Sequence, residues 1–401
     1  MIKKTTLIIL VFLCLCACAG LFEDDYSDSY YDSEESVAYQ SDPVNLESAA
    51  KIYAVKTDPS GRYLAASGVI NGSENVVFIW DLYSGTLIDK LSGHTGNIYS
   101  IDIDSLGRYM VSGGQDNKII IWDFKTREKK HEFTHIDDDG ITSVVFDPSG
   151  FYLFVGGTNA SLCHYSVLYP ELPYIYSPKH DDRISILAVD PLGDYIASGS
   201  NDSTIAVWSY RGFFDNRIRR YSMSCGNRLT ALCFSASGEY LYSGDTDGTL
   251  QVWNVTDGSL EGSIDAHSGT LWWITQIPEG EKFFTGGEDG NINVWEYESG
   301  ELLHTINDGQ EIQSLLVHPG GKILFSGGFD SRINLWDTGS YENIAAFYAF
   351  TDGSLVVTND GYYSGTGSFR SYINDSFFPK EMENNDEVVK ALRQQLLSGG
   401  Q

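Results

Sequence analysis

The chain has 401 residues and a formal net charge of −29, with 55 acidic residues against 26 basic ones. This acidic balance disfavours nucleic acid and anionic membrane surfaces as partners, because their negative charges would be repelled. Net charge carries no information about the fold, so the fold prediction comes from the motifs along the chain.

Residues 1–17 are predicted to be a secretory signal peptide. Lys3 and Lys4 precede an apolar run from residue 7 to residue 17, which is too short to span a membrane. The run leads into Leu-Cys-Ala-Cys, and this ending resembles the lipobox of bacterial lipoproteins. In that family the last cysteine is acylated and the preceding segment is removed, which implies lipidation at Cys18. Cys16 fits less well because a bulky leucine precedes it. The alternative is an ordinary cleaved signal with incidental cysteines.

Residues 18–45 are predicted to form an acidic, flexible tether. Residues 20–43 carry eight acidic side chains and no basic ones, so the segment can bury too little apolar surface to order itself. Several acyl chains on one residue would hold the chain at a membrane far more firmly than a single chain. The lipobox resemblance therefore implies a lipid anchor in a bacterial membrane, with the folded part extracytoplasmic, on the periplasmic or surface side.

A repeated unit then fills residues 46–350. Its clearest copy, residues 93–123, has three runs of alternating apolar residues separated by Gly, Asp and Asn, which predicts an antiparallel meander. A closing aromatic residue recurs at spacings of 42, 43, 43, 45, 42 and 41 residues. The closing residues are Trp80, Trp122, Tyr165, Trp208, Trp253, Trp295 and Trp336. Self-similarity at this period is typical of an array of small sheets.

The units also share their turn signals. Asp-Pro-x-Gly follows the first strand, as in residues 58–61 and 147–150, because Pro presets φ and Gly tolerates a positive φ. A Ser or Thr, an Asp four residues later and a Trp six residues further on complete the pattern. This pattern resembles the WD-repeat family, which implies an all-β, seven-bladed propeller. A closed ring would leave only short, protected strand edges.

In the WD-repeat family, a His before the first strand joins the Asp, the Ser and the Trp in a buried chain of hydrogen bonds. Such a chain stabilises a blade only if every member is satisfied. The resemblance assigns three complete tetrads: His94, Ser112, Asp116, Trp122; His180, Ser198, Asp202, Trp208; and His267, Thr285, Asp289, Trp295. Units one, five and seven lack the His. In unit three, Val155, Asn159 and Tyr165 replace every member except His135.

The end of the ring leaves alternatives open. Residues 43–46 and residues 342–348 could each supply the outer strand of the last blade. Residues 351–383 are predicted to be an extension, in which residues 354–366 echo two strands of unit seven and form a half-blade or an extra hairpin. Residues 384–401 are predicted to be a terminal helix and tail, because Asn384 with Glu387 resembles a capping box before an apolar stripe.

Motifs for catalysis or metal binding give weak signals. His131 to His135 spell H-E-x-x-H, but the repeat places them on an outer strand, where residues four apart lie about 13 Å from each other and cannot share one zinc ion. The acidic turns at 137–139 and 245–247 lack the downstream Glu of a calcium loop. We therefore expect no metal, no cofactor and no catalysis. Cys163, Cys225 and Cys233 are interpreted as reduced and buried, although one bridge stays conceivable.

The remaining candidate site is the top face, defined here as the face onto which the loops before the first strand and between the second and third strands open. In the WD-repeat family this face binds peptides or proteins. Two positions per unit lie there. The first set is Tyr53, Tyr99, Thr142, Ser185, Thr230, Trp272 and Gln313. The second set is Gln115, Thr158, Asn201, Thr246, Glu288 and Phe329, and Arg183 and Arg228 precede two of the first strands.

Exposed aromatic residues together with arginine are typical of binding hot spots. The predicted partner-binding residues are Tyr53, Tyr99, Gln115, Arg183, Arg228, Trp272, Glu288 and Phe329. Successive strand residues point to opposite sides, so Trp272 is predicted on the rim and Trp273 between blades. The alternative is that Trp272 and Tyr99 pack against adjacent blades.

These patterns favour a monomeric propeller that acts as a membrane-anchored, non-catalytic scaffold for a protein or peptide. A propeller enzyme or carbohydrate-binding protein acting at the central channel is the rival class, because propellers host many functions. A purely structural spacer is a third possibility.

Overall fold

The computed structural model describes residues 50–136, 140–210, 219–278, 281–297, 299–351, 353–359 and 363–367. Within these ranges every regular element is a β-strand, and no helix is long and apolar enough to cross a membrane. Cys18, the predicted tether, the candidate strand at residues 43–46 and the predicted terminal helix lie outside the described residues.

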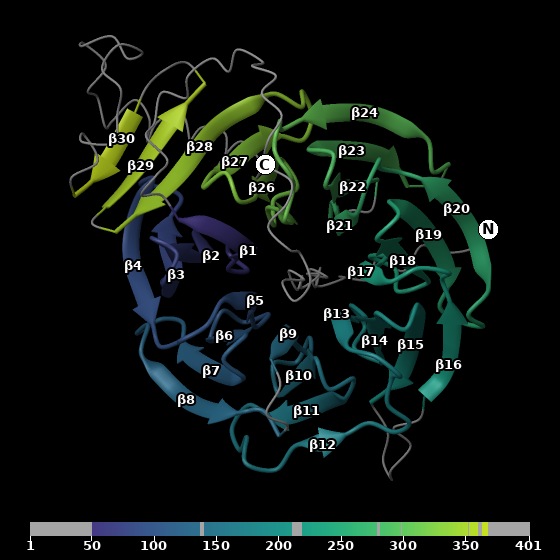
Figure 1. Ribbon diagram of the computed structural model, residues 1–401. Coiled ribbons are helices and arrows are strands. Elements are labelled where there is room, and N and C mark those ends of the chain that lie inside the picture. Colours follow the sequence, from purple (N-terminus) through teal and green to yellow (C-terminus); the bar gives the residue numbers. More distant parts are fainter. Residues whose placement is uncertain are drawn as a thin grey trace, which may run out of the picture.

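The strands form seven antiparallel sheets arranged as the blades of a ring (Figure 1). Blade 1 comprises β1 (Lys51–Thr57), β2 (Tyr63–Ile70), β3 (Glu74–Asp81) and β4 (Thr86–Ser92). Blade 2 comprises β5 (Ile98–Ile103), β6 (Tyr109–Gly114), β7 (Lys118–Asp123) and β8 (Lys129–Thr134). Blade 3 comprises β9 (Ile141–Phe146), β10 (Tyr152–Gly157), β11 (Leu162–Ser166) and β12 (Tyr174–Ile175).

Blade 4 comprises β13 (Ile184–Val189), β14 (Tyr195–Ser200), β15 (Thr204–Ser209) and β16 (Arg219–Ser224). Blade 5 comprises β17 (Leu229–Phe234), β18 (Tyr240–Asp245), β19 (Thr249–Asn254) and β20 (Leu260–Asp265). Blade 6 comprises β21 (Leu271–Gln276), β22 (Lys282–Gly287), β23 (Asn291–Glu296) and β24 (Leu302–Asn307). Blade 7 comprises β25 (Ser314–Val317), β26 (Ile323–Gly327), β27 (Ile333–Asp337), β28 (Asn343–Phe350), β29 (Gly353–Thr358) and β30 (Tyr363–Thr366).

The prediction of a seven-bladed, all-β propeller is confirmed. The first strand of each blade lies nearest the central channel and the fourth lies at the periphery (Figure 1). Because the strands of a blade follow one another as a meander, its first and third loops open on one face and its second loop opens on the other. All loops that enter an innermost strand therefore meet around one end of the channel, which we call the mouth.

The hydrophobic core lies between neighbouring blades. One buried cluster joins apolar residues of blades 1 and 2, another joins blades 2 and 3, and a third joins blades 3 and 4. Glycine allows the blades to approach closely. A Cβ atom added to Gly113 of β6 would come within 2.8 Å of side-chain atoms of Ile141 and Val144 in the next blade. The glycine that follows the tetrad Ser is thus required by packing between blades.

The Asp-Pro-x-Gly turns form because the Asp side chain satisfies the backbone beyond the turn. Asp147 Oδ1 accepts hydrogen bonds from the backbone N–H groups of Phe151, at 2.9 Å, and Tyr152, at 2.8 Å. Gly150 has a φ of 67°, which an L side chain rarely adopts. The turn therefore fixes the register between the first and second strands of blade 3.

The ring is closed by strand β28, so the chain segment at residues 342–348, extended to Phe350, supplies the outer strand of blade 7. Blades 7 and 1 then meet through backbone contacts. Ala50 N donates to Ala349 O at 2.9 Å and Ile52 N donates to Gly328 O at 3.2 Å. Each blade takes its four core strands from one continuous stretch of chain, and closure relies on contacts between sheets.

The predicted C-terminal hairpin is confirmed for the described residues of the extension. β29 and β30 extend blade 7 into a six-stranded sheet, beyond the outer strand β28 (Figure 1). This extension also reaches blade 1, because Lys90 Nζ of β4 donates to Thr351 O at 2.6 Å and to Phe350 O. The hairpin therefore adds a second set of contacts across the closing seam and is no part of an eighth blade.

Candidate functional site

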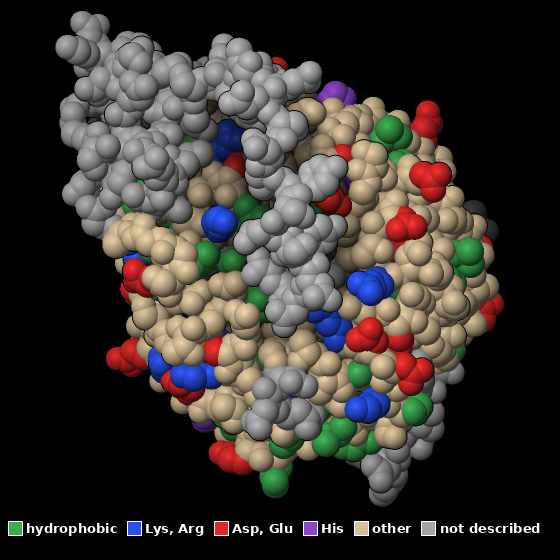
Figure 2. Space-filling model, viewed as in Figure 1, with side chains coloured by type: hydrophobic (Ala, Val, Ile, Leu, Met, Phe, Trp, Pro, Cys, Tyr) green, Lys and Arg blue, Asp and Glu red, His purple; other side chains and the backbone are tan. Residues whose placement is uncertain are grey.

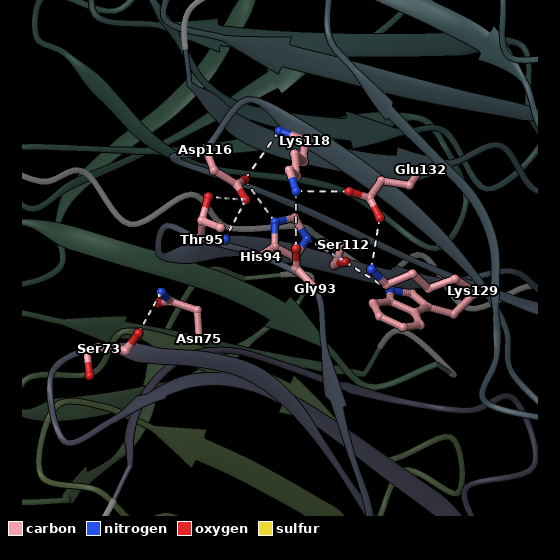
Figure 3. A network of polar contacts seen from close by, with 11 residues as sticks. Ser73, Asn75, Gly93, His94, Thr95, Ser112, Asp116, Lys118, Lys129 and Glu132 are labelled. Carbon is pink, nitrogen blue, oxygen red and sulfur yellow. Dashed lines mark hydrogen bonds and ion pairs between the residues drawn. The ribbon is translucent and has the colours of Figure 1, made fainter.

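The three predicted tetrads assemble as hydrogen-bonded chains. In blade 2, His94 bonds Asp116 through Nδ1 at 2.9 Å and Ser112 through Nε2 at 2.9 Å (Figure 3). Trp122 Nε1 donates to Ser112 Oγ at 3.0 Å. Asp116 also accepts a hydrogen bond from Thr95 N at 2.7 Å, so the chain joins the entry loop, the second strand and the third strand.

The same chain recurs in blades 4 and 6. His180 bonds Asp202 at 2.9 Å and Ser198 at 2.8 Å, and Trp208 donates to Ser198 at 3.0 Å. The blade 6 distances are 3.0 Å for His267 to Asp289, 2.8 Å for His267 to Thr285, and 2.9 Å for Trp295 to Thr285. These side chains face the interior of a blade, so their role is structural.

The tetrads shift the pKa of their carboxyl groups. Burial on its own raises the pKa of Asp116, but the hydrogen bond and charge of His94, with two backbone N–H groups, lower it overall. The pKa of Asp289 is also lowered overall, because the hydrogen bond and charge of His267 outweigh the effect of burial. Both carboxylates therefore stabilise the fold above their ordinary pKa, and this stability is lost as the pH falls through their lowered pKa.

Blades 3, 5 and 7 replace the tetrad in three ways. In blades 5 and 7, the residue 18 positions before the tetrad Ser occupies the place of the His. Blade 3 has Val155 in place of the Ser and keeps His135, whose Nδ1 bonds the Tyr165 hydroxyl directly at 2.7 Å. Blade 5 has Cys225, whose pKa is raised to about 12 by burial and by the charge of Asp245. Trp253 still donates to Ser243 at 2.9 Å in that blade.

Blade 7 has Asp308 in the position of the tetrad His. The Ser326 hydroxyl donates to Asp308, Asn334 Nδ2 donates to it at 2.9 Å, and Trp336 donates to Ser326 at 2.9 Å. Burial raises the pKa of Asp308 to about 6. Sequence reasoning noted only that the His is missing. The constant spacing of 18 residues was the signal that could have identified Cys225 and Asp308.

The first set of predicted top-face residues shares a backbone feature. In six blades this residue is the unpaired residue of a β-bulge in the innermost strand. The six are Tyr53, Tyr99, Thr142, Ser185, Thr230 and Trp272. A bulge turns its extra residue out of the normal alternation, so these side chains surround the mouth.

In blades 3, 4 and 5 the bulge residue holds neighbouring blades together. Thr142 Oγ1 donates to Ile184 O in the next blade at 2.5 Å, and Thr230 Oγ1 donates to Leu271 O at 2.5 Å. The Ser185 hydroxyl donates to Leu229 O in the same way. Each of these hydroxyl groups also reaches a carbonyl of its own blade. This half of the mouth therefore uses the bulge for structure.

The expectation that Tyr53 and Tyr99 are exposed is wrong, because they are only 7 % and 6 % exposed. Their rings pack edge to face with centroids 5.9 Å apart, and Tyr53 packs against Phe329 at 5.5 Å. Lys51 lies 5.8 Å from the Phe329 ring centroid. Aromatic rings from blades 7, 1 and 2 thus form one cluster, which we call the aromatic corner.

Trp272 lies in a different part of the mouth and is half-buried, whereas Trp273 is only 1 % exposed. The two adjacent indoles thus differ in exposure, and the β-bulge at Trp272 interrupts the strand alternation from which their opposite orientation was predicted. Burial and the charge of Glu288 raise the pKa of Glu311, while hydrogen bonds from Trp272 and Gln313 oppose this shift. Gln313 Nε2 donates to Glu311 at 2.6 Å. Blades 6 and 7 therefore combine an indole with two carboxylates.

The other predicted residues of the second set and the arginines also lie at the mouth. Gln115 is exposed in the loop between β6 and β7, and its backbone N–H bonds Asn97 O at 2.8 Å. Glu288 is exposed and accepts a hydrogen bond from Thr270 N at 3.0 Å. Arg183 and Arg228 precede β13 and β17, and are half-buried and exposed, respectively. The structure thus separates the predicted residues into the aromatic corner, a pair of arginines, and Glu288, which with the neighbouring Glu311 forms what we call the acidic corner.

The family model described as "WD domain, G-beta repeat" matches residues 85–123, 127–166, 173–209, 217–254, 258–296 and 300–337, more than half of the chain. The chain belongs to the WD40 repeat family. Each matched segment begins at the outer strand of one blade and ends with the third strand of the next. Each WD40 repeat of the sequence therefore spans two blades: it supplies the outer strand of one blade and the three inner strands of the next.

Individual relatives match only short stretches of this WD40 chain. The Periodic tryptophan protein 2 homolog of Schizosaccharomyces pombe is 32 % identical over 82 residues, which are 20 % of this chain and 9 % of that protein. Set1 complex component swd1 of the same yeast is 40 % identical over 63 residues, 16 % of this chain and 15 % of that protein. The matched stretches span less than a fifth of each relative.

Among solved structures, a chain of "Crystal Structure of Mitotic Checkpoint Complex" superposes with a TM-score of 0.65 at 16 % identity. The superposition covers 79 % of this chain and 99 % of that chain. At this level of identity the likeness concerns the fold alone.

The opposite face of the WD40 propeller has a feature that sequence reasoning missed. Large apolar side chains are exposed in the turns after the innermost strands of three consecutive blades. They are Leu106 at 64 %, Phe151 at 58 % and Leu192 at 62 %. The signal was present, because Leu106 and Leu192 occupy the turn position at which Ser60 and Ser149 stand in blades 1 and 3.

Proposed function

We propose that this WD40 propeller is a non-catalytic scaffold that binds a protein or peptide at the mouth of its top face. A single copy of the propeller, anchored to a bacterial membrane through lipid on Cys18, presents this face on the extracytoplasmic side. The observation that carries the binding proposal is the difference between bulge residues. Blades 3 to 5 use Ser or Thr to bond the next blade, whereas the bulge of blade 6 carries Trp272, a half-buried indole.

The chemistry of the mouth supports a protein ligand. An indole, two arginines and two carboxylates from blades 4 to 7 stand beside an aromatic corner. Trp and Arg are enriched at binding hot spots because they bury a large area and retain polar groups for orientation. The printed name of one relative, Set1 complex component swd1, describes a component of an assembly.

The binding proposal is tested by capture from solubilised membranes followed by mass spectrometry. The wild-type chain and a Trp272→Ala variant are compared, with Leu192→Ser on the opposite face as a matched surface control. We expect one set of proteins to be captured by the wild type and the control and depleted by about tenfold with Trp272→Ala. Equal capture by all three chains would place binding elsewhere.

The anchoring proposal rests on Leu-Cys-Ala-Cys at residues 15–18, after a short apolar run. Replacement of Cys18 by Ala should abolish metabolic labelling with a radioactive fatty acid and leave an uncleaved precursor, because the thiol at the predicted acylation position is removed. Cys16→Ala serves as the control and should keep its label. Unchanged labelling of a chain that carries both substitutions would exclude either cysteine as the anchor.

A second function is favoured by one observation. Glu288 and Glu311 lie close enough for the charge of Glu288 to raise the pKa of Glu311, next to the indole of Trp272. Two carboxyl groups beside an aromatic ring could serve a carbohydrate-binding protein or an enzyme acting at the central channel. Binding to a glycan array that is lost in Glu311→Gln, with protein capture unchanged, would favour this function over the scaffold.

A further inference from the structure

Two arginines at the mouth lie next to each other and have no ion-pair partner in the described part of the chain. Arg183 and Arg228 hold equivalent positions in blades 4 and 5, one residue before the innermost strands β13 and β17. Backbone hydrogen bonds fix both loops, from Asn201 N to Arg183 O at 3.0 Å and from Thr246 N to Arg228 O at 3.1 Å. Basic side chains are visible over β13 and β17 near the middle of the face in Figure 2.

The other arginines behave differently. Six arginine side chains fall within the described residues, and four of them form an ion pair with an Asp. These pairs are Arg62 with Asp81, Arg108 with Asp104, Arg127 with Asp89, and Arg332 with Asp330. Among the described arginine side chains, the two left without such a partner are neighbours at the mouth, although the full chain has 55 acidic residues.

The arrangement of the two arginines is electrostatically unfavourable, because their like charges lie close enough to interact. Arg183 Nε is fully buried and has no hydrogen-bond acceptor among the described residues. Burial lowers the pKa of Arg183, nearby Asp182 raises it, and the positive charge of Arg228 lowers it again. A buried guanidinium N–H without an acceptor costs free energy. This cost is offset when a ligand supplies the missing oxygen atoms.

The rest of the mouth limits what that ligand can be. The acidic corner on blades 6 and 7, with Glu288 and Glu311, repels a ligand that is negative along its whole length. Trp272 lies between the two charged regions in the order of the blades. A peptide with a carboxylate at one end of its binding segment and an apolar or basic side chain at the other fits both corners.

We propose that Arg183 and Arg228 bind a carboxylate group of the partner, a proposal that rests on the scaffold function above. Planar guanidinium groups match carboxylate oxygens with paired N–H donors. The carboxylate belongs to an Asp or Glu side chain or to the free C-terminus of the partner. Phosphate shares the oxyanion chemistry, but two arginines beside two glutamates suit a single negative charge better than a double one.

The experiment measures binding of fluorescent tetrapeptides to the full chain in detergent by fluorescence anisotropy. The probes are a blocked tetrapeptide with one glutamate among glutamines, blocked tetraglutamine, tetraglutamine with a free C-terminus and a blocked peptide with one phosphoserine among glutamines. We expect saturable binding of a carboxylate probe that weakens with added salt. Blocked tetraglutamine should bind about tenfold more weakly, the scale of one charge-assisted hydrogen bond.

The arginines are tested by Arg183→Met and Arg228→Met, which keep an unbranched apolar stem and remove the charged guanidinium group. Each should weaken carboxylate binding about tenfold, while Arg62→Met, far from the mouth, should leave it unchanged. Arg228 is exposed, so Arg228→Met should fold normally. This variant therefore tests whether carboxylate binding depends on the arginines even if Arg183→Met melts at a lower temperature. Arg183→Lys should keep only part of the affinity, because a lysine cannot bind in the bidentate manner.

Three outcomes would overturn the proposal. Neither carboxylate probe binds, or both bind equally well to the Met variants, or only the phosphoserine probe binds. Each of these outcomes leaves the scaffold function standing if Trp272→Ala still depletes the captured partner. Conversely, arginine-dependent binding of a carboxylate with no effect of Trp272→Ala would retain the anion site and remove the indole from the interface.

Discussion

The two halves of the mouth use the same backbone position for different purposes. In blades 3, 4 and 5 the bulge residue is Thr142, Ser185 or Thr230, and its hydroxyl group donates to a carbonyl of the next blade. In blades 6, 1 and 2 the bulge residue is Trp272, Tyr53 or Tyr99. Tyr53 and Tyr99 are buried in the aromatic corner, whereas Trp272 is half-buried at the mouth.

This difference separates what the fold needs from what a ligand can use. A Ser or Thr at the bulge contributes one hydrogen bond between blades, and the ring is complete without it in the other half. The tetrads do not follow the same division, because complete ones occur in blade 4 of the first half and in blades 2 and 6 of the second. The frame is therefore common to both halves, and only the mouth differs.

The largest expected effect concerns this common frame. Asp202→Ala in the first half and Asp116→Ala or Asp289→Ala in the second half should cost similar amounts of stability. Each leaves a buried His and a backbone N–H without a partner, at about 1–3 kcal/mol for each unsatisfied group. Asn159→Ala, in the blade where Tyr165 replaces the chain, should cost clearly less. Urea unfolding measures these differences, and equal losses for all four variants would contradict the tetrad assignment.

A smaller effect concerns the one blade that places a carboxyl group in the position of the His. The pKa of Asp308 is raised to about 6 from its usual 3.8. A raised carboxyl pKa means that the stability of the fold falls as the pH rises from about 3.8 to about 6, and the cost is complete above that range. Asp308→Asn should therefore stabilise the chain by up to about 3 kcal/mol at pH 8 and by much less at pH 4.

Melting temperatures of the wild type and Asp308→Asn across pH 4 to 8 check this sign. Asp116 supplies the control, because its lowered pKa gives the opposite dependence: its contribution is present at neutral pH and is lost in acid. A constant difference between Asp308→Asn and the wild type at every pH would show that Asp308 does not titrate in this range.

A smaller effect again is expected at the bulges of the first half. Thr230→Val keeps the shape of the side chain and removes the hydrogen bond to Leu271 O, which should lower stability by about 1 kcal/mol. Partner capture should not change, because the hydroxyl group is used between blades. Chemical denaturation and the capture assay together test both statements. A variant with full stability and weakened capture would move the binding site into the first half.

The fold was accessible from the sequence because the repeat is visible in its turns and aromatic residues. The Asp-Pro-x-Gly turns and the Trp positions predicted seven sheets, and the resemblance to the WD-repeat family assigned the three tetrads. The closing strand could not be chosen, since residues 43–46 and 342–348 both have a strand-like pattern and only the ring geometry selects β28. Cys225 and Asp308, which stand in place of the tetrad His in blades 5 and 7, were not predicted because neither residue type belongs to the WD-repeat pattern.

The candidate site was predicted less completely than the fold. Register alone placed Trp272, Arg183 and Glu288 at the mouth, since each lies at a fixed distance from a turn. It could not show that Tyr53 and Tyr99 turn toward each other and become buried, because this depends on contacts between residues of different blades. Nor could it pair Trp272 with Glu311, which a different unit of the repeat supplies.

The most direct test of the account compares two adjacent tryptophans. Trp272 is half-buried at the mouth, and Trp273 is 1 % exposed between blades. Trp272→Ala should leave the melting temperature nearly unchanged and weaken capture of the partner by about tenfold or more. Trp273→Ala should lower stability by about 3–5 kcal/mol, as loss of a buried aromatic side chain does. A large drop in melting temperature for Trp272→Ala, or unchanged capture, would contradict the assignment of the mouth as the binding site.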